Sequence, residues 1–135
     1  MAFKGSCLCG AATYEASGPV IRLNLCHCRM CQKTSGSAYG AFLRVAKASL
    51  HWRTGASHIS TFESSPGVTR AFCSQCGSTL TWSRDESEGV GIAAGTVDEG
   101  EIPDAPTSQF WCSMSPAWHL CRDDVEQFST ELIAP

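Results

Sequence analysis

The stretch "CSQCG", residues 73–77, places two cysteines three positions apart and follows the second with a glycine. The two intervening residues allow a tight turn to present both sulfur atoms to one ion, and the glycine supplies the backbone conformation that such a turn needs. This pattern is typical of a zinc knuckle. It supplies half of the ligands of a closed tetrahedral zinc site, so two more ligands must come from elsewhere in the chain.

A second pair of cysteines lies in "CLC", residues 7–9. Side chains alternate along an extended strand, so Cys7 and Cys9 would project from the same face. Together with Cys73 and Cys76 they would complete a set of four thiolates around one ion. Such a site is closed and therefore structural, and it would tie the first strand to a hairpin far along the chain.

The third cluster is "LCHCRMC", residues 25–31, which holds Cys26, Cys28 and Cys31. Three protein ligands with an exchangeable fourth position are how catalytic zinc is usually held. Strand alternation directs His27 away from these ligands, either to the surface or to a position that supports them.

Spacing alone leaves the partition of the cysteines open. Cys26 and Cys28 could join the knuckle, which would leave "CLC" together with Cys31. The fourth position beside Cys26, Cys28 and Cys31 could also be closed, which would give two structural sites and no chemistry. The candidates to close it are Cys112, Cys121, His51, His58 and His119.

The chain has nine cysteines in 135 residues, and the length predicts one domain over residues 1–135. The N-terminal "MAFKGSCLCG" has no apolar signal segment, because Lys4 and Gly5 interrupt it. We therefore expect a cytoplasmic protein with reduced thiols and no membrane partner. An odd number of clustered cysteines then favours metal binding over a disulfide framework.

Charge is distributed unevenly along the chain, which has a net charge of −3. Eight of the ten Lys and Arg residues lie in residues 1–70, whereas eleven of the thirteen acids lie in residues 71–135. The basic half could attract an anionic small molecule, although two solvated faces that neutralise each other would give the same pattern. The basic residues nearest the third cysteine cluster are Arg22, Arg29, Lys33, Arg44 and Lys47.

Glycine and proline divide the chain into short runs of strand character, so we expect a mostly β domain. The runs are residues 11–16, 39–45, 49–52, 58–64, 69–73, 78–83, 90–97 and 108–114. The best helical candidate is "CRDDVEQFS", residues 121–129, with two aspartates near its start. Three tryptophans are expected in the core, Trp82, Trp111 and Trp118, with Trp118 the best candidate to line a pocket.

Five motifs together resemble the glutathione-dependent formaldehyde-activating enzyme family, which also contains centromere protein V. They run in order from Gly5 to about His119: "GSCLCGAATYE", "CHCRMCQKTSGSAYGAF", "SSPGVTRAFCSQCGSTLTW", "AAGTVDEG" and "SPAWHL". The resemblance implies a β-tent of small antiparallel sheets stapled by structural zinc. It also implies that the structural zinc binds Cys7, Cys9, Cys73 and Cys76, and that a second zinc binds Cys26, Cys28 and Cys31.

The reaction that the resemblance implies is the addition of the glutathione thiol to formaldehyde, which is classed as a carbon–sulfur lyase reaction. Its partners would be a small thiol such as glutathione and an aldehyde, and its cofactors two zinc ions per chain. The catalytic residues would be Cys26, Cys28 and Cys31, since an open thiophilic zinc suits attack by a thiolate on a carbonyl carbon. Cys112 and Cys121 are not part of the family pattern.

Two other functions remain open at this point. A zinc-stabilised module could bind protein or nucleic acid without catalysis, although a pI of about 5.7 argues against a nucleic-acid partner. The four-cysteine set could also hold iron, which would colour the protein.

Overall fold

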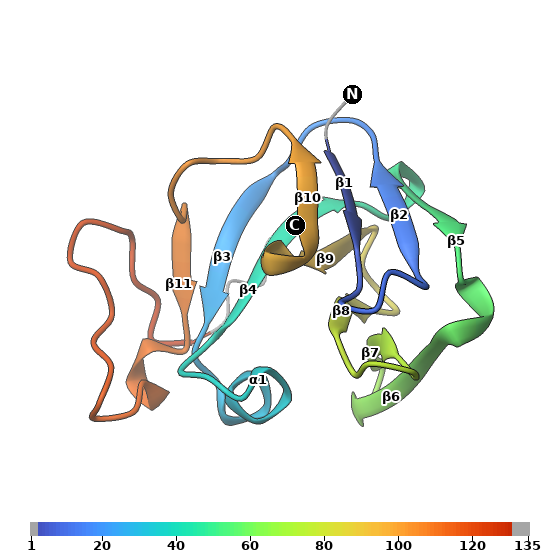
Figure 1. The fold of residues 1–135 in the computed structure, drawn as a ribbon. Helices are drawn as coiled ribbons and strands as arrows, with labels where there is room; N and C mark the ends of the chain where they lie inside the picture. The colour runs from blue at the N-terminus through green and yellow to red at the C-terminus, as the bar shows by residue number, and fades with distance from the viewer. Residues whose placement is uncertain (1–2, 131–135) are drawn as a thin grey trace.

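The computed structural model describes residues 3–130 of the chain. They form two sheets, as Figure 1 shows, and most of the regular structure is strand. The smaller sheet has the strand order β10-β1-β2-β5, and the larger has the order β11-β3-β4-β9-β8-β7-β6. The prediction of a mostly β fold built from small sheets is confirmed.

The smaller sheet is antiparallel throughout. Its strands are β1 (Phe3–Ser6), β2 (Thr13–Ala16), β5 (Leu50–Thr54) and β10 (Val97–Gly100). The larger sheet is antiparallel except where β11 pairs with β3 in parallel. Its strands are β3 (Arg22–Cys26), β4 (Gly40–Ala46), β6 (Ile59–Ser65), β7 (Val68–Cys73), β8 (Thr79–Arg84), β9 (Gly89–Ala93) and β11 (Ser108–Phe110).

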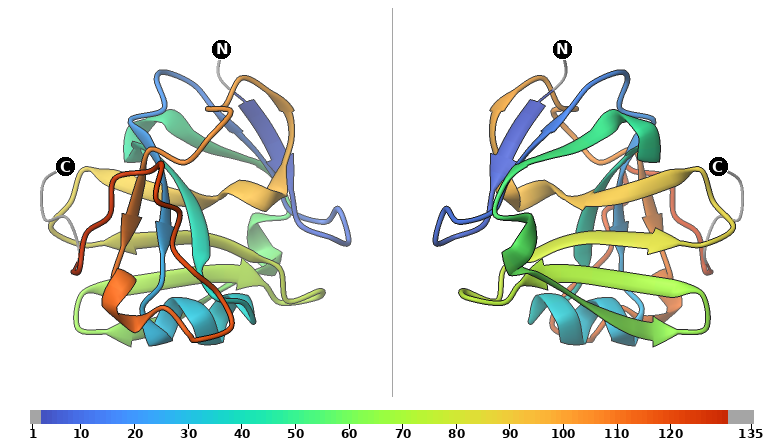
Figure 2. Two further views of the ribbon diagram at one scale, coloured as in Figure 1. Left: turned by 90° about the vertical axis from the view of Figure 1, so that its left-hand side faces the viewer. Right: turned by 90° about the vertical axis from the view of Figure 1, so that its right-hand side faces the viewer.

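One α-helix, α1 (Arg29–Ser35), lies in residues 3–130, at the lower edge of the molecule in Figures 1 and 2. Four short 3-10 turns join strands or follow them: η1 (Lys47–Ser49), η2 (Ala56–His58), η3 (Ala94–Thr96) and η4 (Cys112–Met114). None of the helices in this part of the chain is long and apolar enough to cross a membrane.

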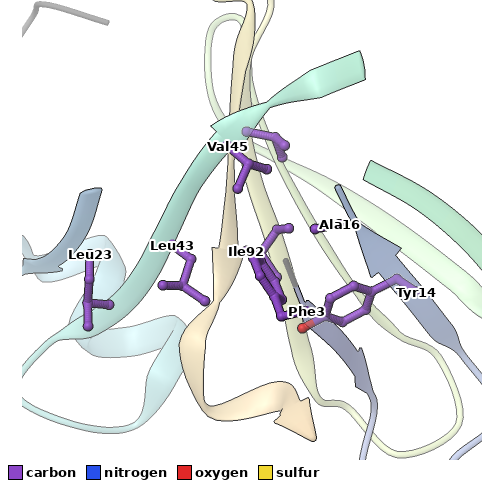
Figure 3. Packing of buried hydrophobic residues seen from close by; sticks show 8 residues of the cluster. Phe3, Tyr14, Ala16, Leu23, Leu43, Val45 and Ile92 are labelled. Atoms are coloured by element: carbon purple, nitrogen blue, oxygen red, sulfur yellow. The ribbon is translucent and has the colours of Figure 1, made fainter. Parts of the chain in front are cut away.

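The main hydrophobic core lies between the two sheets. Phe3, Tyr14 and Ala16 from the smaller sheet pack with residues of β3, β4 and β9 from the larger one (Figure 3). The latter are Leu23, Leu43, Val45, Val90 and Ile92. The alternation of buried and exposed residues along β1 and β2 directs one face of the smaller sheet into this core.

The predicted helix at residues 121–129 is wrong. This segment runs beside β11, where Gln109 forms an isolated parallel bridge with Gln127. The side chain of Gln109 is fully buried and donates from Nε2 to the carbonyls of Arg122 and Val125. Hydrogen bonds to a neighbouring strand therefore replace the local bonds that a helix would have made.

Candidate metal centres and an arginine-lined cavity

Cys7, Cys9, Cys73 and Cys76 come together in the structure, and their sulfur atoms all lie within 4.8 Å of one another. Cys7 and Cys9 lie just after β1, whereas Cys73 ends β7 and Cys76 lies in the turn before β8. The group therefore joins the smaller sheet to the larger one. We call it the four-cysteine group.

The spacing of these sulfur atoms suits a tetrahedral metal. Cys9 Sγ lies 3.6 Å from Cys7 Sγ and 3.8 Å from Cys73 Sγ. Two thiolates bound to one zinc ion at about 2.3 Å each would be about 3.8 Å apart. The donor set and its geometry thus fit zinc.

Backbone and hydroxyl groups around the four-cysteine group favour thiolates. The Ala12 amide donates to Cys7 Sγ at 3.3 Å. Hydrogen bonds from the Ser78 side chain and amide lower the pKa of Cys76 to about 5. The expected strand geometry of "CLC" is wrong, since β1 ends at Ser6 and a turn closed by the Gly10 amide on the Cys7 carbonyl presents both sulfurs.

Cys26, Cys28 and Cys31 form a second group, with all three sulfur atoms within 4.8 Å of one another. Cys26 ends β3, Cys28 is the N-cap of α1, and Cys31 lies within α1. The Cys28 sulfur accepts a hydrogen bond from the Cys31 amide, as an N-cap side chain does. Local helix capping therefore brings the second and third cysteines together. We call this set the three-cysteine group.

The three thiols do not ionise alike. Hydrogen bonds from Cys26 and Cys31, aided by the positive charge of Arg70, lower the pKa of Cys28 to about 2. Contacts with Cys28 and Cys31, together with burial, raise the pKa of Cys26 well above its ordinary value.

Arg70, on β7, reaches the three-cysteine group from across the fold. Its Nη1 and Nη2 atoms lie 3.7 and 3.6 Å from Cys31 Sγ, and its side chain is almost fully buried. It also donates to Thr34 Oγ1 and to Ser64 Oγ. The sequence gives no sign of this role for Arg70, because "TRAFC" indicates only a strand.

A cavity of about 290 Å³ adjoins the three-cysteine group, and all three of its cysteines line it. This volume is near the lower end of the range of about 300–1,000 Å³ for small-molecule sites. Its apolar walls include Phe42, Val68, Trp82 and Phe110. The described residues that line it include five arginines and no acidic side chain: Arg22, Arg29, Arg44, Arg70 and Arg84.

Several contacts fix these arginines in the wall. Arg22 lies over the Phe110 ring at 5.6 Å and Arg84 over the Trp82 ring at 5.4 Å. Arg44 donates to Ser87 Oγ. Three of the five basic residues predicted near the site line the cavity, namely Arg22, Arg29 and Arg44, whereas Lys33 and Lys47 do not. The described wall of the cavity thus carries five guanidinium groups.

The residues predicted as possible fourth ligands lie elsewhere. No described His, Asp, Glu or further Cys joins the three-cysteine group within 4.8 Å. Cys112 and Cys121 lie instead with His27, which is fully buried and not at the surface. The expectation that His27 points away from the three-cysteine group agrees with this arrangement.

The tryptophan prediction is wrong for Trp118, which is 73% exposed and does not line the cavity. Trp82 and Trp111 are half-buried and line it. Trp111 has φ 56°, and within residues 3–130 no other non-glycine residue has a positive φ. Backbone strain of this kind often occurs at functional sites.

Comparisons with known proteins agree with the motifs. The family model described as "Glutathione-dependent formaldehyde-activating enzyme" matches residues 2–114. A protein of Halomonas elongata that bears that enzyme's name provisionally is 36% identical over 87 residues, which cover 59% of this chain and 55% of the relative. An "uncharacterized lyase" of Schizosaccharomyces pombe is 32% identical over 78 residues, covering 58% of this chain and 55% of the relative.

This chain thus aligns with about half the length of these curated relatives. The fold also resembles the crystal structure of a Rhodobacter sphaeroides protein, with a TM-score of 0.62 and 22% identity. That alignment covers 74% of this chain and 91% of the other.

Proposed function

Since the chain belongs to the glutathione-dependent formaldehyde-activating enzyme family, we propose that it is a zinc-dependent carbon–sulfur lyase-type enzyme. It would add a thiol such as glutathione to formaldehyde or a similar carbonyl compound. The observation that supports this most is a three-cysteine group in the wall of a cavity with five arginines. The names of the two relatives, one a formaldehyde-activating enzyme and the other a lyase, agree with the proposal.

In this proposal Cys7, Cys9, Cys73 and Cys76 hold a structural zinc ion, and Cys26, Cys28 and Cys31 hold a second one at the active site. The second ion would supply Lewis-acid chemistry and lower the pKa of a thiol bound to it. We further propose that residues 1–135 form one domain and that the protein is cytoplasmic.

The side chains of the cavity would bind and orient the substrate. Guanidinium groups match carboxylates bidentately, so the arginines would hold the two carboxylates of glutathione and orient its thiol toward the three-cysteine group. The apolar walls exclude water, which strengthens these charge interactions. Arg70 places positive charge beside Cys31 and would offset the excess negative charge of three thiolates around one divalent ion.

The test follows thiol addition to formaldehyde by exchange NMR, which separates the enzyme's excess rate from the uncatalysed background. We expect Arg22→Gln to raise KM for glutathione roughly tenfold, because it removes a charge-assisted contact worth at least about 1.4 kcal/mol. Arg53→Gln is the matched control, since Arg53 pairs with Glu15 on the smaller sheet and does not line the cavity. No excess rate from the zinc-loaded protein with any thiol would favour a non-catalytic binding module.

A further inference from the structure

A third group of metal-ligating side chains lies outside both cysteine groups. The ligand atoms of His27, Cys112 and Cys121 all lie within 4.8 Å of one another. His27 lies between β3 and α1, Cys112 begins η4, and Cys121 follows in the next loop. The family motifs do not include either of these cysteines, and the proposed reaction does not use them.

The distances in this group suit a tetrahedral metal with mixed ligands. His27 Nε2 lies 3.6 Å from Cys121 Sγ. An imidazole nitrogen and a thiolate on one zinc ion, at about 2.0 and 2.3 Å, would be about 3.6 Å apart. This one pair of atoms therefore has the separation that a shared ion would impose. Cys121 Sγ also lies 3.9 Å from Nδ1, so the ring would have to turn its Nε2 toward the sulfur to bind the same ion.

The tautomer of the His27 ring also suits a ligand. Its Nδ1 lies 3.2 Å from the Phe110 carbonyl oxygen, which can only accept, so Nδ1 carries the proton and Nε2 has the lone pair. The Nε2 atom has two neighbours that could share it, His119 Nε2 at 3.4 Å and Cys121 Sγ at 3.6 Å. Histidines that bind metals commonly have such a backbone contact at the other ring nitrogen, because it fixes the tautomer and the ring. His27 is fully buried, so the lone pair faces protein and not water.

His119 is the nearest further donor. Its Nε2 lies 3.4 Å from His27 Nε2, and the two rings stack with 5.4 Å between centroids. Two imidazole nitrogens on one tetrahedral zinc would be about 3.3 Å apart. His119 is not among the three residues whose ligand atoms all lie within 4.8 Å of one another, and it adjoins them through His27.

We propose that His27, Cys112 and Cys121 bind a third metal ion, in addition to the two zinc ions of the proposed enzyme. Two thiolates and an imidazole within 4.8 Å of one another would select a thiophilic divalent ion of the zinc class. The ion would fasten the segment after β11 to the junction of β3 and α1. This segment includes Trp111 and Met114, which line the cavity, and the Met114 carbonyl accepts a hydrogen bond from Gln32 of α1.

The first test counts zinc in full-length protein that has been purified with reductant and saturated with zinc. We expect three equivalents per chain for the wild type and two for the Cys112→Ser, Cys121→Ser double variant. Ser113→Ala is the matched control on the same turn and should keep three. The double variant should retain its far-UV circular dichroism. Equal zinc content in the wild type and a folded double variant would overturn the proposal.

A second test needs no variant and so does not depend on whether the double variant folds. The other two groups contain only sulfur ligands, so zinc X-ray absorption of the wild type should show imidazole scattering only if His27 binds an ion. Sulfur scattering without imidazole would overturn the proposal, as would a Cys112–Cys121 disulfide found by mass spectrometry in the zinc-saturated protein. Neither test measures catalysis, so failure of the proposed enzyme function would not affect the outcome.

Discussion

The side chain of Arg70 connects the larger sheet to α1 in the wall of the cavity. It contacts Cys31 Sγ through both terminal nitrogens and anchors its own Nε on Ser64 at 3.0 Å. A buried guanidinium beside a thiol stabilises the thiolate, because the two opposite charges offset each other's loss of water. Arg70 is therefore the residue outside the three-cysteine group that should most affect its charge.

We expect Arg70→Gln to lower the excess rate of thiol addition at least tenfold, which corresponds to about 1.4 kcal/mol in the barrier. The reason is the loss of a charge-assisted contact to the sulfur of Cys31. Arg70→Lys keeps the charge and should recover part of the rate. Zinc content and thermal stability, measured on the same samples, separate this effect from loss of folding. Equal rates for Arg70→Gln and wild type would contradict the assigned role.

The two cysteine groups should respond differently to a single change. Cys73 is fully buried and belongs to the group that joins the sheets, so Cys73→Ser should unfold the protein or strongly destabilise it. Cys31→Ser should leave most of the far-UV signal intact and abolish the excess rate, because the three-cysteine group then has one ligand fewer. Thermal unfolding and elemental analysis of both variants check this. Equal destabilisation by both changes would make the three-cysteine group structural.

Loss of the Tyr14 proton at high pH should lower the stability of the folded protein. Its O–H donates to Thr96 Oγ1 at 2.8 Å, and the Thr96 hydroxyl donates in turn to the Ala93 carbonyl. Burial raises the pKa of Tyr14 to about 12, whereas an unfolded tyrosine has a pKa of about 10. The folded protein thus keeps a proton that the unfolded chain loses, so this contribution to stability is present below pH 10 and is lost as pH rises toward 12.

By pH 11 this loss should reach about 1.4 kcal/mol in the free energy of unfolding. The Tyr14→Phe variant cannot lose a proton at this position, so its free energy of unfolding should not show this loss. Urea unfolding of both proteins at pH 8 and pH 11 measures the difference. The gap between wild type and variant should shrink as pH rises, and a constant gap would show that Tyr14 does not titrate in this range.

At the scale of elements, close backbone approach explains why β1 needs a glycine. A Cβ at position 5 would lie 2.2 Å from the Tyr14 hydroxyl and 2.4 Å from the Thr96 carbonyl oxygen. Gly5→Ala should therefore displace β1 or Tyr14 and destabilise the fold by about 1–3 kcal/mol. Gly95→Ala is the matched control, since a Cβ there meets nothing within 4 Å. Chemical denaturation compares the two variants, and similar midpoints would contradict this packing.

Alternating and β-branched patterns were enough to predict most strands, but they missed β1 and β3 and joined β9 to the start of β10 in one run. The strand β3 has Asn24 among its buried residues, which broke the pattern, and β1 has only four residues. The C-terminal segment failed for a different reason. Its aspartates suggested the start of a helix. In the structure Asp124 pairs with Arg122, and the Gln109 side chain donates hydrogen bonds to backbone carbonyls of the segment. A distant strand decided this conformation, so local sequence could not.

Local spacing predicted that the cysteines within each motif would lie together, and the resemblance to the family implied which motifs would combine into the two groups that the structure brings together. The arginines from β7 and β8 could not be predicted in this way. Arg70 and Arg84 reach the cavity only because the larger sheet places their strands near α1. The same holds for His27 and Cys121, which are 94 positions apart in sequence. Tertiary neighbours of this kind leave no local signal.

At the scale of the whole molecule, the four-cysteine group lies where the two sheets meet. Cys7 and Cys73 belong to a small buried cluster with Ala12 and Leu80, which is separate from the main core. With so little apolar burial there, the proposed zinc ion would supply much of the free energy that holds the sheets together. The three-cysteine group lies at the end of β3 and in α1, so its metal would not join the two sheets.

Removal of metal should therefore occur in two stages. A three-ligand site holds zinc less tightly than a closed four-thiolate site, so a graded series of chelator concentrations should first release zinc from the three-cysteine group and from the proposed third site. At that stage the excess rate should be lost while the far-UV circular dichroism stays unchanged. The last equivalent of zinc should leave together with the secondary structure, because binding at the closed site is coupled to folding. A chromophoric chelator measures release and circular dichroism measures structure on the same sample. Release of all the zinc with the sheets intact would show that the four-cysteine group does not hold the fold together.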